Sequence, residues 1–147
     1  MASGCRRRVK VLTGLVSGLE DLRVHMTRML EPAPQALSVT DCPVLRAVGA
    51  AMTPGVSAGE AWARVRAREG RRGGGIDALA REDLEALDGL LEHLGESGRQ
   101  QQERLLTDAG RALARNLESA RACAGEAERL YVSLGLLTGL TLALVVL

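Results

Sequence analysis

The end of the chain, Leu130 to Leu147, contains no charged residue and consists mostly of Leu and Val. As an α-helix this segment would be roughly 27 Å long, close to the ~30 Å hydrocarbon core of a bilayer. A buried core helix is the alternative, but a chain of 147 residues can hardly cover every face of an all-apolar helix. We therefore predict a transmembrane helix at 130–147, preceded by a cytosolic helical domain at 1–129.

The flanks of this segment predict its orientation. Arg121 and Arg129 precede it, so the positive-inside rule places the main domain in the cytoplasm. Gly135 and Gly139 form a G-x-x-x-G pair, which is either a packing face for another transmembrane helix or an ordinary use of Gly in membrane helices. The predicted anchor residues are Leu130, Tyr131 at the interface, Leu134, Leu136, Leu137, Leu140, Leu142, Leu144 and Leu147.

The first part of the chain has the apolar period of a helix. Apolar residues recur at steps of three and four from Val9 to Met29, and Pro32 and Pro34 are expected to end the helix. Gly14 and Gly18 interrupt the stripe. The chain has no Phe, one Trp and one Tyr, so we expect a thin bundle with an aliphatic core.

The middle of the chain predicts two more short helices. Asp41, with Pro43 close behind, is expected to start one of them; residues 34–41 fit either a helical turn or a loop. Ser57 and Glu60 form a capping box for the next, which carries Trp62 and Val65 inward. A Gly-rich linker follows near 70–75.

Two helices are predicted after the linker. One begins near Ala80 and stops at Gly95, with Glu85, Asp88 and Glu92 on a face that we expect to be solvated. Ser97 and Gln100 form a second capping box. From about residue 97 an unbroken three–four stripe predicts one helix to the end of the chain.

No pattern in the sequence predicts catalysis, a metal site or a cofactor. His25 and His93 lie on different predicted helices without neighbouring ligands. The cysteines Cys5, Cys42 and Cys123 are far apart, and an odd count cannot pair fully, which suits a reducing cytosol; we expect Cys123 to act as a small apolar residue. The formal net charge of +1 gives no field for nucleic acid, and no small-molecule substrate is expected.

Four ordered motifs resemble the stage III sporulation protein AB family. They are the run Tyr131–Gly139 entering the apolar end, the helix start Gly59-Glu-Ala-Trp62, the turn Leu94–Arg99 with Gln102, and the Leu19-Glu20 pair. Gly98 stands where the family usually has an acidic residue. The family normally begins with a membrane segment, which would precede the basic Arg6–Lys10 stretch; either the start is placed too late or this member has one anchor.

The resemblance implies a non-enzymatic component of an endospore-formation membrane complex that connects mother cell and forespore. It further implies partners within that complex, a mother-cell membrane location, self-association into a homo-oligomer as one option, and a domain similar to type II secretion F-type platform proteins. The alternative is a soluble helical regulatory or nucleic-acid-binding protein whose apolar tail packs internally or dimerises. The two hypotheses differ in whether the full chain is recovered with membranes.

Overall fold

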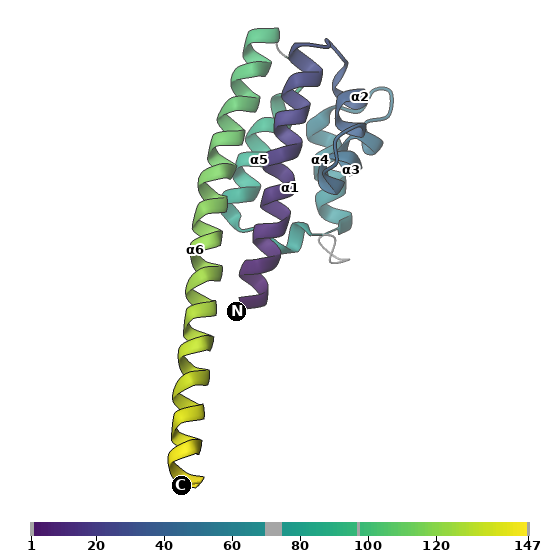
Figure 1. Cartoon of the computed structure of the whole chain (residues 1–147). Coiled ribbons are helices and arrows are strands. Elements are labelled where there is room, and N and C mark those ends of the chain that lie inside the picture. The colour runs from purple at the N-terminus through teal and green to yellow at the C-terminus, as the bar shows by residue number, and fades with distance from the viewer. Residues whose placement is uncertain (1, 70–74, 97, 147) are drawn as a thin grey trace.

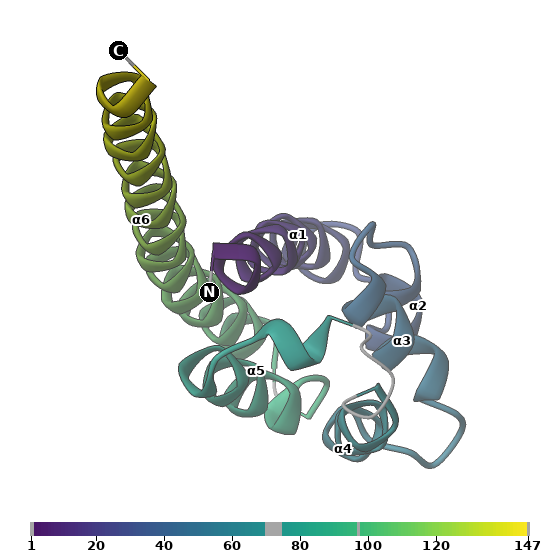
Figure 2. The ribbon, with the colours of Figure 1, turned by 90° about the horizontal axis from the view of Figure 1, so that it is seen from below.

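The computed structural model describes residues 2–69, 75–96 and 98–146, and over these residues every regular element is a helix (Figure 1). In chain order the elements are α1 (Ala2–Thr27), α2 (Ala33–Ser38), α3 (Pro43–Ala51), α4 (Ala58–Glu69), the 3₁₀ helix η1 (Ile76–Ala78), α5 (Arg81–His93) and α6 (Arg99–Val146). Seen along the axis in Figure 2, they follow one another around a ring in which α6 closes against α1. The prediction of an all-α fold is confirmed.

The antiparallel pair of α1 and α6 is the most extensive helix contact in the bundle (Figure 1). Leu12, Leu15 and Leu22 of α1 are fully buried, and Leu113 of α6 is fully buried as well. Burying one Leu side chain stabilises a fold by about 2 kcal/mol, so the aliphatic stripes predicted from the sequence supply much of the core. The short helices α2 and α3 cover the far side of α1.

Gly18 allows α3 to approach α1 closely. A Cβ built on Gly18 would lie 2.8 Å from the Cβ of Cys42 and 2.9 Å from Leu45 Cδ1. A Cβ on Gly14 would meet nothing within 4 Å. The two glycines that interrupt the stripe therefore differ: Gly18 is required by packing, whereas Gly14 only lowers the helix propensity of α1.

Three details near the α1–α2–α3 turns differ from the sequence predictions. α1 ends at Thr27, before Pro32, because Leu30 adopts a left-handed conformation with φ 57° that reverses the chain. Met29 therefore leaves the predicted stripe and is 58% exposed. The N-cap of α3 is Cys42 rather than Asp41, and the ambiguous stretch forms α2.

A buried ion pair that the sequence did not reveal joins the start of α1 to the start of α5. The Asp83 carboxylate is fully buried and accepts hydrogen bonds from Arg8 Nε at 2.8 Å and Nη2 at 3.0 Å. It also accepts a bond from the backbone N–H of Ala80 at 2.8 Å, which caps α5. The hydrogen bond with Asp83 raises the pKa of Arg8 above its ordinary value.

A disulfide joins Cys5 of α1 to Cys123 of α6, with the two Cα atoms 6.2 Å apart. The prediction that Cys123 acts as a small apolar residue is therefore wrong, since its side chain is exposed and bonded. The bonded pair also departs from the reduced cysteines expected in a reducing cytosol. Cys42 is the free cysteine and is buried at the contact between α1 and α3. Burial raises the pKa of the Cys42 thiol.

The helix α6 is a single helix of 48 residues, roughly 72 Å long at the usual rise. The prediction of one long helix through this region is confirmed, although it begins at Arg99, and Ser97 of the predicted capping box lies outside the described residues. No helix within the described part of the chain is both long and apolar enough to cross a membrane, so the structure does not support the transmembrane helix predicted at 130–147.

We predict opposite effects for alanine at the two α1 glycines. Gly14→Ala should raise the free energy of unfolding by about 0.5–1 kcal/mol, because it removes a flexible residue without a clash. Gly18→Ala should lower it by about 1–3 kcal/mol, because its Cβ overlaps Cys42 and Leu45. Urea unfolding followed by circular dichroism measures both values. Equal shifts of the same sign would contradict the close approach of α3 at Gly18.

We predict that loss of the buried Asp83 carboxylate costs far more than loss of an exposed one. Asp83→Ala should lower the free energy of unfolding by about 3 kcal/mol, because it leaves Arg8 partly buried and Ala80 N–H unbonded. Asp77 is the matched control, since its pair with Arg7 at 2.9 Å is exposed to solvent. Asp77→Ala should cost less than about 1 kcal/mol in the same urea titration. Similar losses for both variants would show that Asp83 is not a buried anchor.

We predict that the three cysteines differ in reactivity toward maleimide. In native oxidised protein none should react, because Cys5 and Cys123 are bonded and Cys42 is buried. After mild reduction of the native protein Cys5 and Cys123 should react within minutes, and Cys42 only after unfolding. Intact-mass spectrometry reports the number of labels at each step. Labelling of Cys42 at the rate of the other two would contradict its burial.

Candidate functional site

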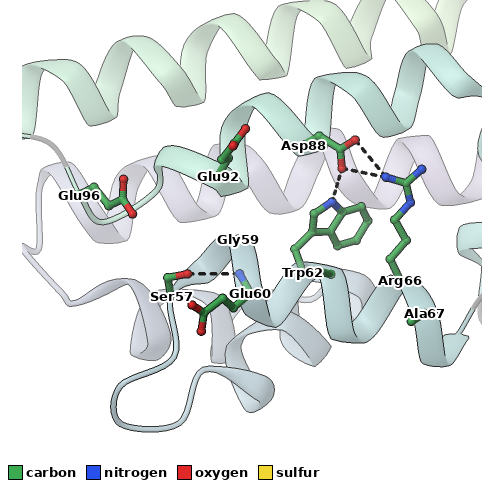
Figure 3. Close-up of a pocket in the computed structure, with 10 residues that line it drawn as sticks. Ser57, Gly59, Glu60, Trp62, Arg66, Ala67, Asp88, Glu92 and Glu96 are labelled. Atoms are coloured by element: carbon green, nitrogen blue, oxygen red, sulfur yellow. Dashed lines mark hydrogen bonds and ion pairs between the residues drawn. The ribbon is translucent and has the colours of Figure 1, made fainter.

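A groove runs between α4 and α5 (Figure 3). In Figure 2 these two helices lie on the side of the ring away from α1. The volume of the groove is about 850 Å³. The lining residues come from the start and outer face of α4 and from the outer face and end of α5: Ser57, Gly59, Glu60, Trp62, Ala63, Arg66, Ala67, Asp88, Glu92 and Glu96. The groove therefore has a floor of small residues and a rim of charged ones.

The first turn of α4 forms one end of the groove. The Ser57 hydroxyl accepts a hydrogen bond from the backbone N–H of Glu60 at 3.2 Å, which is the contact that an N-terminal cap makes. A Cβ on Gly59 would lie 3.3 Å from the Cα of Glu92, so Gly59 lets α4 start directly against the backbone of α5. This contact gives the Gly59–Trp62 motif a structural role.

Trp62, Asp88 and Arg66 form a polar network inside the groove (Figure 3). The Trp62 indole N–H donates to Asp88 Oδ1 at 2.5 Å, while Arg66 Nη1 donates to both carboxylate oxygens at 3.1 and 3.0 Å. The indole itself is 3% exposed, as the sequence predicted for an inward residue. The face of Glu85, Asp88 and Glu92 is solvated as expected, with the Asp88 side chain 41% exposed, but the Asp88 carboxylate also joins α5 to α4.

The charged side chains that line the groove suit the binding of a partner. Three further carboxylates, those of Glu60, Glu92 and Glu96, line it beside the network, and all three residues are exposed.

Elsewhere, His25 Nδ1 contacts Glu31 Oε2 at 3.0 Å, far along the chain from these residues. Within the described residues no group of three or more His, Cys, Asp or Glu side chains is arranged to hold a metal ion.

The last part of α6 is a second candidate surface, because it extends beyond the rest of the bundle (Figure 1). Its large apolar side chains from Leu130 onward are exposed, from 59% at Leu134 to 83% at Val146. The alternative in which this tail packs internally is therefore wrong for the described side chains. The predicted anchor residues Leu136, Leu137, Leu140, Leu142 and Leu144 are all among the exposed ones.

The other predicted site residues are distributed along α6. A Cβ built on Gly135 or Gly139 would meet nothing within 4 Å, so their face of the helix is open. Arg121, Arg129 and the predicted cap residue Gln100 are exposed. The side chain of Tyr131 and the whole of Leu147 lie outside the described residues.

The start of α1 lies beside α6 just before this exposed tail. The bond between Cys5 and Cys123 fixes that position, and Figure 1 shows the N-terminus of the chain next to α6. Residue 130 follows residue 123 by roughly 10 Å along the helix. The exposed residue Arg6 is therefore brought near the beginning of the apolar segment, which the sequence alone does not reveal, whereas Lys10 lies about 7–8 Å farther from it than Cys5 along α1.

Comparison with known proteins agrees with the motif order noted in the sequence. No curated protein and no solved structure matches the chain significantly, so the likeness to type II secretion F-type domains stays a prediction. The sequence model described as stage III sporulation protein AB matches residues 1–147. Because that match covers the whole chain, the protein belongs to the stage III sporulation protein AB family.

Proposed function

We propose that this protein is a non-enzymatic structural component of the membrane complex that connects mother cell and forespore during sporulation. Membership of the stage III sporulation protein AB family gives it a role related to sporulation. The single observation that carries the rest is the exposure, at 59–83%, of the large apolar side chains described at the end of α6. In this proposal the tail crosses the membrane once, and the bundle of residues 1–129 remains on the cytoplasmic side of the mother cell.

The scale of the exposed apolar surface supports a lipid environment. Monomeric proteins seldom expose contiguous apolar patches larger than a few hundred Å² to water. Here consecutive turns of one helix present Leu or Val on every side, with exposed fractions of 59% or more for the large residues. A partner protein would typically cover one face, whereas lipid tails can solvate all faces of such a helix.

The basic start of α1 supports contact with the membrane surface. Arg6 and Lys10 are exposed beside α6, and Arg121 and Arg129 lie on α6 on the same approach to the tail. Basic residues near an anionic leaflet contribute about 1 kcal/mol each to binding. The same residues support the cytoplasmic orientation through the positive-inside rule.

Contacts with other proteins of the complex would use two surfaces of this chain. The open face at Gly135 and Gly139 lets a second transmembrane helix approach closely. The groove between α4 and α5 offers a binding surface in the cytoplasmic bundle. In this proposal the protein needs no cofactor, small-molecule substrate or nucleic acid, and its role is to hold partners at the membrane.

We predict that two arginines in the tail release the protein from the membrane. The tail favours insertion by about 4–5 kcal/mol, and each Arg near the centre of a span costs about 2.5–3.5 kcal/mol. Leu137→Arg with Leu140→Arg should therefore move the full-length protein from the carbonate-resistant membrane fraction of sporulating cells to the soluble fraction. Immunoblotting of both fractions measures the change.

The matched control places the same charges outside the tail. Ser119→Arg with Ala122→Arg alters exposed positions of α6 before the apolar segment and should leave the protein in the membrane fraction. The proposal is contradicted if the unmodified protein is recovered in the soluble fraction. It is equally contradicted if the tail variant stays as firmly bound as the control.

A further inference from the structure

Within the described residues, the acidic rim of the α4–α5 groove has no internal counter-charge. Glu60, Glu92 and Glu96 are exposed, and none has a cation of this chain within ion-pair distance. Arg66 cannot serve, because Asp88 already holds it at 3.0 Å. The rim therefore favours a partner that brings positive charge to the groove.

The complementary charge lies on the outer face of α6. Arg104, Arg111 and Arg115 are exposed and are separated by seven and four residues, so they share one face of the helix. That face is opposite to the buried stripe at Leu106 and Leu113, which packs into the bundle. Asp108 and Glu118 lie on the same face, which therefore carries three arginines and two carboxylates and keeps an excess of positive charge opposite a groove lined mostly by carboxylates.

We propose that the α4–α5 groove of one copy of this chain binds the arginine face of α6 from a second copy. This proposal rests on the membrane anchoring proposed above, which sets two copies parallel and at the same depth. The surfaces are different patches of the same chain, so the contact is heterologous. Repetition of such a contact joins more than two copies side by side in the plane of the membrane.

The heights of the two surfaces along the bundle agree with this arrangement. α5 and α6 are antiparallel and joined by the short turn around Gly95, where φ is 87° (Figure 1). The Cys5–Cys123 bond and the Arg8–Asp83 pair place the start of α5 near the level of residue 120 of α6, so Asp88 and Glu92 are roughly level with residues 111–115. Arg111 and Arg115 of a second copy at the same depth therefore face this part of the groove.

The floor of the groove allows a helix to approach closely. Gly59, Ala63 and Ala67 are spaced by four residues and line the groove along one face of α4. Small side chains leave room for the long arginines of the incoming helix to lie across the floor and reach the rim. Confinement of both copies to one membrane raises their effective concentration, so a modest interface is sufficient.

Site-directed cross-linking tests the contact. One set of chains carries Ala63→Cys on the groove floor, and a second carries Asp108→Cys on the arginine face of α6. Both are full-length and lack the native cysteines through Cys5→Ser, Cys42→Ala and Cys123→Ser, with folding checked by circular dichroism. After mild oxidation of proteoliposomes, a disulfide-linked dimer should form in the mixture of both sets and not in either set alone.

Charge reversal then tests the ion pairs. E92K with E96K in the groove chain should lower the dimer yield about fivefold or more, as should R104E with R111E in the α6 chain. Combining the two reversed chains should restore the yield, because the charges again attract. This rescue separates a specific contact from loss of folding in either variant.

Reversals elsewhere on the surface provide the matched controls. D21K with D41K, and R28E with R46E, change the net charge equally at exposed positions outside both surfaces, and should leave the dimer yield unchanged. Absence of the mixed dimer, or a yield indifferent to charge reversal, would overturn the proposal. Carbonate extraction of the same vesicles tests the anchoring separately. Chains that resist extraction but do not cross-link contradict the groove contact and agree with the anchoring.

Discussion

The contact between α1 and α6 sets the arrangement of the whole molecule. One uninterrupted helix, α6, has to pack in a bundle over its first half and stand free over its second. The buried stripe of α6 continues through Leu117 to Ala120, where the exposed fraction is still only 1%. Beyond Cys123, which is bonded to Cys5 of α1, the large apolar side chains that the structure describes are exposed. The change of environment along one helix follows from the extent of α1, which begins beside Cys123.

Two interactions hold the start of α1 in this position. The buried pair of Arg8 and Asp83 ties α1 to α5, and the disulfide between Cys5 and Cys123 ties it to α6. A cross-link that closes a loop of 118 residues lowers the entropy of the unfolded chain. In the loop-entropy description this stabilises the fold by about 5 kcal/mol. Both lie at the end of the bundle nearest the apolar tail. They therefore hold the bundle together where α6 leaves it.

The sequence predicted those features that depend on local pattern. The inward positions of Trp62 and Val65, the stop near Gly95 and the single long helix all follow from apolar spacing and turn residues, and the structure has them. The family resemblance from four ordered motifs also agrees with the match over residues 1–147.

Features that depend on distant parts of the chain were not predictable in this way. Asp83 is buried, and its partner Arg8 is 75 residues away in sequence. Asp88 had the spacing of a solvated face, and only the position of α4 gives it Trp62 and Arg66 as partners. Cys5 and Cys123 gave no short-range signal, because their pairing requires α1 and α6 to be antiparallel.

The central claim is that the second half of α6 is surrounded by lipid rather than by water or by its own fold. Single cysteines placed along α6 of the full-length chain in liposomes, labelled with a membrane-impermeant maleimide, test it most directly. The account predicts labelling with a helical period up to about residue 129, then protection on every face from 132 to 146. Continuous labelling, or a helical period that persists to the end, would contradict it.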